Sequence, residues 1–112
     1  YERYHLPILV TENGIGAPDI LEADGKIHDA YRIQFIREHL QQMRLAITDG
    51  VQILGYCPWA AIDVVSTHQG YRKRYGFIYV DREEFDLKEL KRFRKDSFYW
   101  YANVILENGQ NL

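Results

Sequence analysis

Two short apolar runs flank an amphipathic helix pattern, and this order leaves few folds open to the chain. Residues 6–10, Leu-Pro-Ile-Leu-Val, form the first run, and residues 51–57 form the second. Between them, apolar residues recur every three or four positions, as on one face of an α-helix: Ile33, Ile36, Leu40, Met43 and Ile47. Short aliphatic runs are typical of strands buried on both faces. Strand, helix and strand with short connections predict a right-handed βαβ unit with parallel strands.

Local signals mark where this first helix begins and ends. Asp29 is its expected N-cap, because a carboxylate there can accept hydrogen bonds from the free N–H groups of the first turn. Gly50 fits the left-handed residue that ends a helix. Pro58 stops the second apolar run.

The rest of the chain is less regular. Residues 58–75 are predicted to be a loop, and residues 76–80 a short strand. Asp86 and Glu89 form a capping box that predicts a second helix, which Asn108-Gly109 ends. The whole chain is therefore predicted to be two βα units with a long loop inserted at residues 58–75.

Two parallel strands and two helices do not close a fold by themselves. Parallel sheets are normally covered by helices on one side and by more sheet or barrel interior on the other. The chain either associates with copies of itself or belongs to a larger α/β protein, and we favour the second. It has 112 residues and opens with Tyr1 instead of Met, so we expect a piece whose true start is missing.

Composition argues against several classes of function. Lys and Arg number 14 and Asp and Glu 16, a net charge of −2, which argues against a nucleic-acid binder that depends on overall phosphate attraction. No apolar run approaches the roughly 20 residues of a membrane-spanning helix. The single cysteine and four scattered histidines supply neither a disulfide framework nor a metal site. We expect Cys57 to be a small buried residue.

Candidate catalytic residues follow the two apolar strands. Glu12 lies where the first strand ends, and Trp59 and Asp63 follow the second, at the end where parallel α/β folds gather their active sites. A partly desolvated glutamate must be paired, protonated or functional, and an indole can stack on the apolar face of a sugar. The alternatives are a water-facing turn glutamate for Glu12 and a core or lid residue for Trp59. Asp63 is expected to accept hydrogen bonds within its loop.

A third group of candidates lies around Gly70. Ser66, Lys73 and Tyr75 offer two hydroxyls and an ammonium, which suit a phosphate or another small anion. The alternative is a basic surface loop. Arginines flank Lys73 on both sides, and the sequence leaves open which base points inward.

Thr11-Glu12-Asn13-Gly14 closes the first strand, and segments 55–63, 70–81 and 95–101 follow it in order. They resemble four motifs of glycoside hydrolase family 1. These are the Thr-Glu-Asn-Gly nucleophile motif, the Gly-Tyr-x-x-Trp-Ser-Leu-x-Asp segment, the Gly-Tyr…Arg-Phe-Gly-x-x-Tyr-Val-Asp block and the Lys-x-Ser-Phe-x-Trp-Tyr pattern. Four ordered matches are far more specific than any one, although Pro58 and Ala60 depart from the commonest family residues.

The resemblance implies an α/β fold in which residues 1–112 are the C-terminal fragment of a single TIM-barrel domain. The fragment would hold the last two βα units, seven and eight, and would be incomplete as a barrel on its own. Glu12 would be the nucleophile of retaining β-glycoside hydrolysis, which uses two carboxylates roughly 5–5.5 Å apart. The family's acid/base glutamate lies in an Asn-Glu-Pro motif that does not occur here. We therefore expect the isolated chain to be inactive.

Within the family, the loop after Asp63 resembles that of the 6-phospho-β-glucosidases. Ordinary β-glucosidases carry a Glu-Trp pair that grips the outer hydroxyls of the sugar, and Ser66-Thr67 stands there instead. Loss of a carboxylate suits a phosphorylated sugar, because two anions in contact repel each other. The spacing of Ser66, Lys73 and Tyr75 matches the family's phosphate-binding trio, with Trp59 lining the sugar subsite. The absence of Trp at position 67 favours the phospho-gluco over the phospho-galacto type.

The resemblance implies a full-length enzyme that hydrolyses 6-phosphorylated β-glucosides without a cofactor or metal. From the charge balance and the short apolar runs we expect no nucleic-acid or membrane partner. A cytoplasmic location follows from the phosphorylated substrate and not from a targeting signal. Two alternatives remain: a fragment of an unphosphorylated β-glucosidase, and a catalytically inactive fragment that self-associates.

Overall fold

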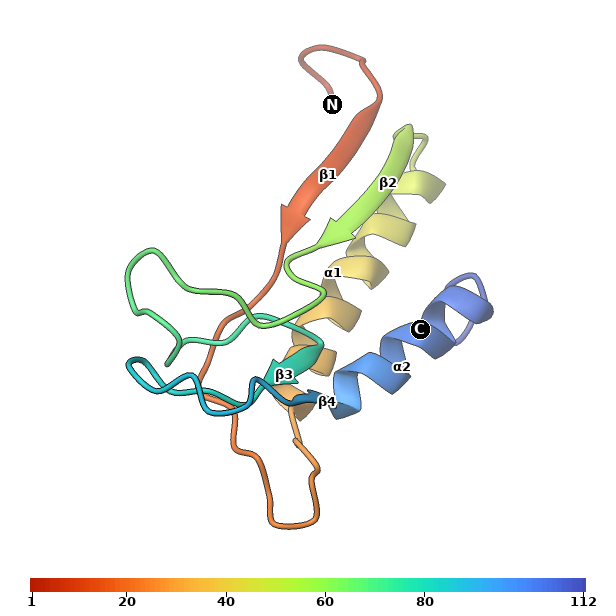
Figure 1. Cartoon of the computed structure of the whole chain (residues 1–112). Coiled ribbons are helices and arrows are strands. Elements are labelled where there is room, and N and C mark those ends of the chain that lie inside the picture. Colours follow the sequence, from red (N-terminus) through yellow and green to blue (C-terminus); the bar gives the residue numbers. More distant parts are fainter.

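Two parallel strands and two helices, joined by long loops, make up most of the regular structure (Figure 1). The computed structural model describes all residues, 1–112. Its helices and strands, in chain order, are β1 (Ile8–Asn13), α1 (Ala30–Thr48), β2 (Ile53–Pro58), β3 (Ile78–Val80), β4 (Arg92–Arg94) and α2 (Asp96–Leu106). No helix combines the length and apolar character needed to cross a membrane.

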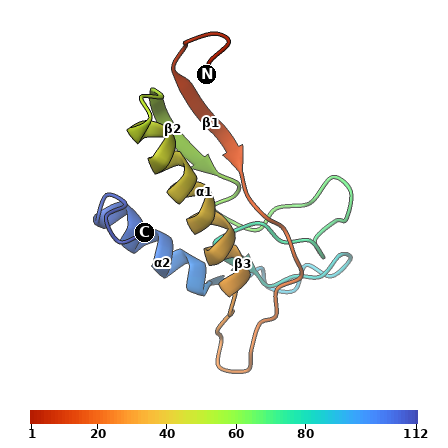
Figure 2. The same cartoon turned by 180° about the vertical axis from the view of Figure 1, so that it is seen from behind.

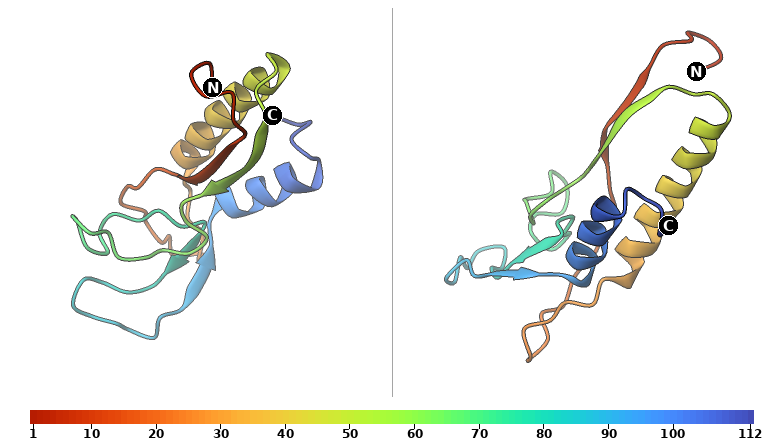
Figure 3. Two further views of the ribbon diagram at one scale, coloured as in Figure 1. Left: turned by 90° about the horizontal axis from the view of Figure 1, so that it is seen from above. Right: turned by 90° about the vertical axis from the view of Figure 1, so that its right-hand side faces the viewer.

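The predicted order of strand, helix and parallel strand is confirmed. β1 pairs with β2 in parallel, from Ile8 opposite Ile53 to Asn13 opposite Pro58. Both helices lie on one side of this pair, as the right-hand view of Figure 3 shows. The other side is open, because Leu9 and Leu54 remain 49% and 71% exposed. The expectation of an uncovered sheet face is therefore confirmed.

The hydrophobic core lies between the two helices and the segment before β3. Its buried members are Ile36, Leu40, Phe77 and Val104. The rings of Phe77 and Tyr101 stack with centroids 5.0 Å apart and planes 7° apart. α1 and α2 run side by side over this core in the view from behind (Figure 2). Only 16 of the 112 residues are buried, so much apolar surface stays exposed.

The prediction of a helix starting at Asp86 is wrong. Residues 92–94 form β4, which pairs antiparallel with β3, with Phe93 opposite Tyr79. Lys88 and Leu90 have positive φ angles of 46° and 53°, which a right-handed helix does not accommodate. α2 therefore begins at Asp96, ten residues later than the capping box suggested.

The predicted helix ends are confirmed. Gly50 has φ of +92° directly after α1, and Asn108 and Gly109 have φ of +49° and +72° just beyond α2. Such left-handed residues end helices because they turn the chain away from the helix axis.

Asp29 does not cap α1 with its side chain, contrary to expectation. It stands at the N-cap position, but its carboxylate accepts hydrogen bonds from the backbone N–H and the hydroxyl of Ser97, in the first turn of α2. It also forms an ion pair with Arg32. The carboxylate is thus used to join the starts of the two helices and is completely buried.

A buried ionic network extends from this point and joins six charged side chains. Three are carboxylates and three are cations: Asp19, Asp29, Asp63, Arg32, Arg74 and Lys95. The Lys95 ammonium donates to Asp19 at 2.6 Å and to Asp63 at 2.7 Å. Arg32 donates to Asp19 at 3.1 Å. Buried charges are tolerated only when they are paired, and here the charges balance.

Burial and neighbouring charges pull in opposite directions on the cations of this network. Burial acts to lower the pKa of Arg32, but the carboxylates of Asp19 and Asp29 outweigh it and raise the pKa above its ordinary value. Burial lowers the pKa of Lys95, and Arg32 adds to this effect while the two carboxylates oppose it. The carboxylate partners therefore offset the cost of burying both cations.

Asp29→Ala should destabilise the protein by about 3 kcal/mol, because it leaves Arg32 short of one buried partner and removes the contact to Ser97. Urea unfolding followed by circular dichroism measures the change. Asp24→Ala is the matched control, since Asp24 pairs only locally with Lys26 at the surface. An equal shift of both midpoints would contradict a special role for Asp29.

Candidate active site

The site forms where the two parallel strands end. The side chain of Asn13, the last residue of β1, accepts a hydrogen bond of 2.6 Å from the Tyr56 hydroxyl on β2. Its backbone carbonyl accepts from Trp59 N at 2.7 Å. Burial, with a smaller contribution from Tyr101, raises the pKa of Tyr56 to about 12, so the hydroxyl remains a donor at neutral pH. Glu12, next to Asn13, is exposed at this edge.

Gly14 brings the two strand ends unusually close. A Cβ atom at this position would lie 1.9 Å from the backbone oxygen of Trp59. Only glycine allows such an approach between two backbones. The Trp59 backbone is also tied to the segment before β3, because Ala60 N donates to Tyr75 O at 3.2 Å.

One cavity of about 300 Å³ gathers several predicted residues. One lining residue comes from β1, and the others come from the loop between β2 and β3: Glu12, and then Trp59, Val65, Ser66, Thr67 and Tyr75. Glu12 is the single carboxylate among them. Trp59 remains 43% exposed and is therefore not a core residue. A carboxylate, an exposed indole and hydroxyl groups are the side chains that bind and attack a sugar.

Lys73 lies beside this cavity and is not among its lining residues. Its ammonium lies 5.3 Å from the centroid of the Tyr75 ring. Gly16 leaves room for both side chains, because a Cβ there would come within 2.7 Å of Tyr75 and 2.9 Å of Lys73. The two predicted anion-binding residues are thus neighbours on the loop between β2 and β3, and they pack against the loop that follows β1.

Ser66 opens a tight turn over residues 66–70. Its backbone exchanges hydrogen bonds with Gly70, at 2.8 and 3.1 Å. The residue is 9% exposed, and its hydroxyl accepts weak hydrogen bonds from the N–H groups of His68 and Gln69. The hydroxyl hydrogen is therefore free to donate to a ligand.

The structure decides which base of the 72–74 run points inward. Arg74 is 6% exposed and donates to Asp63 at 3.0 Å and to the carbonyl of Val80 at 2.8 Å, while Arg72 is exposed. Asp63 also accepts from Gly76 N and from Lys95, so its predicted role as a hydrogen-bond acceptor in the loop is confirmed.

Sequence reasoning missed Arg74, Asp19 and Lys95 as the residues that hold this region together. The alternation of Lys73, Arg74 and Tyr75 was the available signal, because successive residues of an extended segment point to opposite sides. The prediction that Cys57 is buried is also wrong. Cys57 is exposed, because two strands alone leave much of β2 uncovered. No three His, Cys, Asp or Glu side chains group as metal ligands.

Comparisons with known proteins agree on one family. The family model for glycosyl hydrolase family 1 matches residues 1–110. The chain is 53% identical over 110 residues to the aryl-phospho-beta-D-glucosidase BglC of Bacillus subtilis, and 50% identical over 113 residues to a phospho-cellobiase of Klebsiella oxytoca. A solved beta-glucosidase of Thermotoga maritima superimposes with a TM-score of 0.87 and 39% identity.

The chain matches only part of each of these proteins. The alignments cover 98% and 100% of this chain but 23% and 24% of the two relatives. The superposition covers 96% of this chain and 24% of the solved structure. The chain therefore spans about a quarter of the length of the proteins it matches, and its fold is a fragment of theirs.

Gly14→Ala should push the Trp59 backbone away from Asn13, because the added methyl group overlaps a backbone oxygen that has no freedom to move alone. We expect a loss of about 1–3 kcal/mol in stability and a change in Trp59 fluorescence. Gly55→Ala is the control, since its Cβ meets only the flexible end of Leu9 at 3.2 Å. Equal effects of the two substitutions would show that Gly14 has no special role in shaping this edge.

Proposed function

Because the chain belongs to glycosyl hydrolase family 1, we propose that it is the C-terminal quarter of a retaining 6-phospho-β-glucosidase. The observation that carries the proposal is the cavity that brings Glu12, Trp59, Ser66 and Tyr75 together at the carboxyl ends of two parallel strands. The fragment supplies one catalytic carboxylate and the part of the site that recognises the phosphate.

Glu12 acts as the nucleophile. Its carboxylate attacks the anomeric carbon and forms a covalent glycosyl–enzyme intermediate, while the bond to the leaving oxygen breaks and a second carboxylic acid protonates that oxygen. Water then cleaves the intermediate, with the second carboxylate as base. This second group lies outside the 112 residues, since Glu12 is the single carboxylate lining the cavity.

The phosphate of the sugar lies against Ser66, Lys73 and Tyr75. The two hydroxyls donate hydrogen bonds to phosphate oxygens, and Lys73 contributes a positive charge. Lys73 stands next to Tyr75, within reach of the same edge of the cavity. No carboxylate occupies position 66 or 67, so the site avoids repulsion between two anions. Trp59 stacks on the apolar face of the sugar.

The two strand–helix pairs correspond to units seven and eight of a (β/α)8 barrel and form part of one domain. The open face of β1 and β2, with Leu9 and Leu54 exposed, is the side that the rest of such a barrel covers. A phosphorylated glucoside as substrate places the whole enzyme in the cytoplasm. The fragment requires no metal or cofactor for this chemistry.

A second candidate is an enzyme for unphosphorylated β-glucosides. The observation in its favour is the superposition on a Thermotoga maritima beta-glucosidase at 39% identity. The relatives named as acting on phosphorylated substrates are more similar, at 50–53% identity, which supports our first choice.

The gene product at its natural length should hydrolyse a chromogenic 6-phospho-β-glucoside in preference to the plain glucoside. Lys73→Ala should lower kcat/KM for the phosphorylated substrate about thirtyfold, the equivalent of about 2 kcal/mol for a hydrogen bond to a charged group.

Glu12→Gln should reduce activity by about 10⁴-fold, because the nucleophile is lost. Intact-mass analysis and steady-state kinetics measure these outcomes. Faster turnover of the plain glucoside would favour the second candidate.

The isolated 112-residue chain should be inactive on both substrates and should self-associate. It lacks the second carboxylate, and its exposed apolar side chains have no cover, as for Leu54 at 71% and Leu106 at 81% exposure. Size-exclusion chromatography with light scattering gives the oligomeric state. Turnover that depends on Glu12 in the purified fragment, or a well-behaved monomer, would contradict this prediction.

A further inference from the structure

The outer end of the 66–70 turn is held by a side chain from a distant loop. Glu84 lies on the loop between β3 and β4, and its carboxylate accepts a hydrogen bond of 2.7 Å from Tyr71 N. Gly70, the last residue of the turn, packs so closely on this carboxylate that a Cβ would lie 2.1 Å from one of its oxygens. The turn that begins with Ser66 thus ends directly against Glu84.

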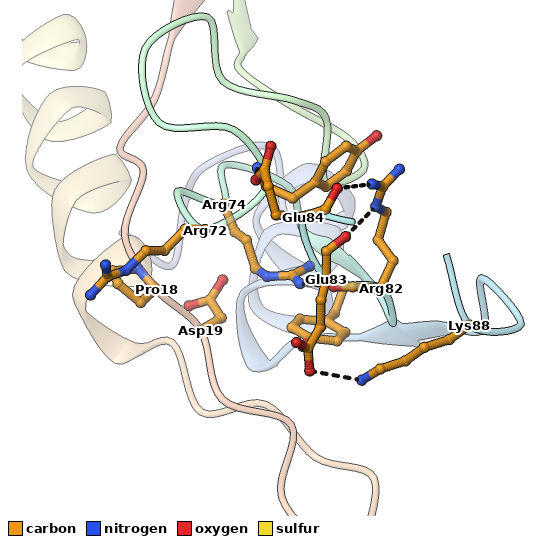
Figure 4. A pocket seen from close by; sticks show the side chains of 10 residues that line it. Pro18, Asp19, Arg72, Arg74, Arg82, Glu83, Glu84 and Lys88 are labelled. Atoms are coloured by element: carbon orange, nitrogen blue, oxygen red, sulfur yellow. Dashed lines mark hydrogen bonds and ion pairs between the residues drawn. The ribbon is translucent and has the colours of Figure 1, made fainter. Parts of the chain in front are cut away.

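Glu84 is in turn restrained by its neighbours. The Arg82 guanidinium lies 3.8 Å from the centroid of the Tyr71 ring, and Arg82 also donates to the backbone carbonyls of Glu83 and Glu84, at 2.9 and 2.8 Å. Figure 4 shows Arg82 reaching these two carbonyl groups at the edge of a cavity of about 280 Å³. Tyr71 therefore contacts the Glu84 carboxylate through its backbone N–H and the Arg82 guanidinium through its ring.

This clamp is connected to the buried network. Arg74 donates to the carbonyl of Arg82 at 2.7 Å and, on its other side, to Asp63. Arg74 and Asp19 line the same cavity as Glu84 and Arg82 (Figure 4). Contacts therefore run without a break from the buried Asp63 through Arg74 and Arg82 to Glu84.

We infer that Glu84 is a positioning residue for phosphate recognition, and this inference rests on the proposed function. It is not among the residues that line the cavity with Glu12. It acts through Tyr71 and Gly70, which close the turn that carries Ser66 and lead directly into Lys73 and Tyr75. The middle of the anion-binding segment, between Ser66 and Lys73, is thus fixed by one carboxylate from the β3–β4 loop. The contacts of Glu84 reach this segment and not Glu12.

The inference predicts a selective effect on phosphorylated substrate. In the gene product at its natural length, Glu84→Ala should raise KM for a chromogenic 6-phospho-β-glucoside about fivefold, as expected for loss of one charge-assisted hydrogen bond that is partly exposed. The kcat for this substrate and the KM for the plain glucoside should stay within twofold of the wild type. Glu84→Gln keeps an oxygen that accepts from Tyr71 N and should recover most of the loss.

Glu83→Ala is the matched control, because the neighbouring side chain pairs only with Lys88, at 3.5 Å, and does not reach the turn. A Glu84→Ala enzyme that behaves like the Glu83→Ala enzyme would overturn the inference. So would an equal loss on both substrates, which would indicate a general structural role. A wild-type enzyme without preference for the phosphorylated substrate would instead refute the proposed function, before any variant is compared.

Discussion

Asp63 accepts hydrogen bonds from Lys95 at 2.7 Å and Arg74 at 3.0 Å, inside the protein and out of contact with water. These contacts join the loop after β2, the segment before β3 and the start of α2. Leaving any of these charges unpaired is costly at such a depth, so few arrangements of the three segments satisfy all of them. Asp19, on the loop after β1, pairs with Lys95 and with Arg32 of α1, so these two segments are restrained by the same charge pairing. The long loops of this chain are ordered by charge pairing more than by apolar burial.

The candidate site follows from this arrangement. Glu12 and Trp59 reach the same cavity because parallel strands end on the same side and because Gly14 lets their backbones approach closely. Ser66 and Tyr75 reach it because Asp63 and Arg74 fold the 66–75 segment back over the strand ends. The position of the proposed nucleophile thus depends on the sheet, and the positions of the proposed anion-binding residues depend on the ionic network.

Local patterns in the sequence were enough to predict much of the fold. The helical periodicity and the helix ends at Gly50 and Asn108-Gly109 depend on residues close together in the chain. The parallel pairing of the two apolar runs joins distant residues, but the order of strand, helix and strand with short connections predicts it. The position of β4 was not predictable in this way. The capping box at Asp86 is a local signal, and it predicted a helix here. The pairing of Phe93 with Tyr79 and the positive φ angles of Lys88 and Leu90 exclude that helix.

The sequence by itself determined the strand–helix–strand order of the first half, the family motifs and the chemical types available at the strand ends. Only the tertiary structure decided that Asp29 joins α2 to α1, that Arg74 and not Arg72 points inward, and that Glu84 supports the 66–70 turn. The physical reason is sequence distance. Asp29 and Ser97 are 68 residues apart. A buried charge pairs with whichever group the fold brings near it, and a local sequence pattern does not show which group that is.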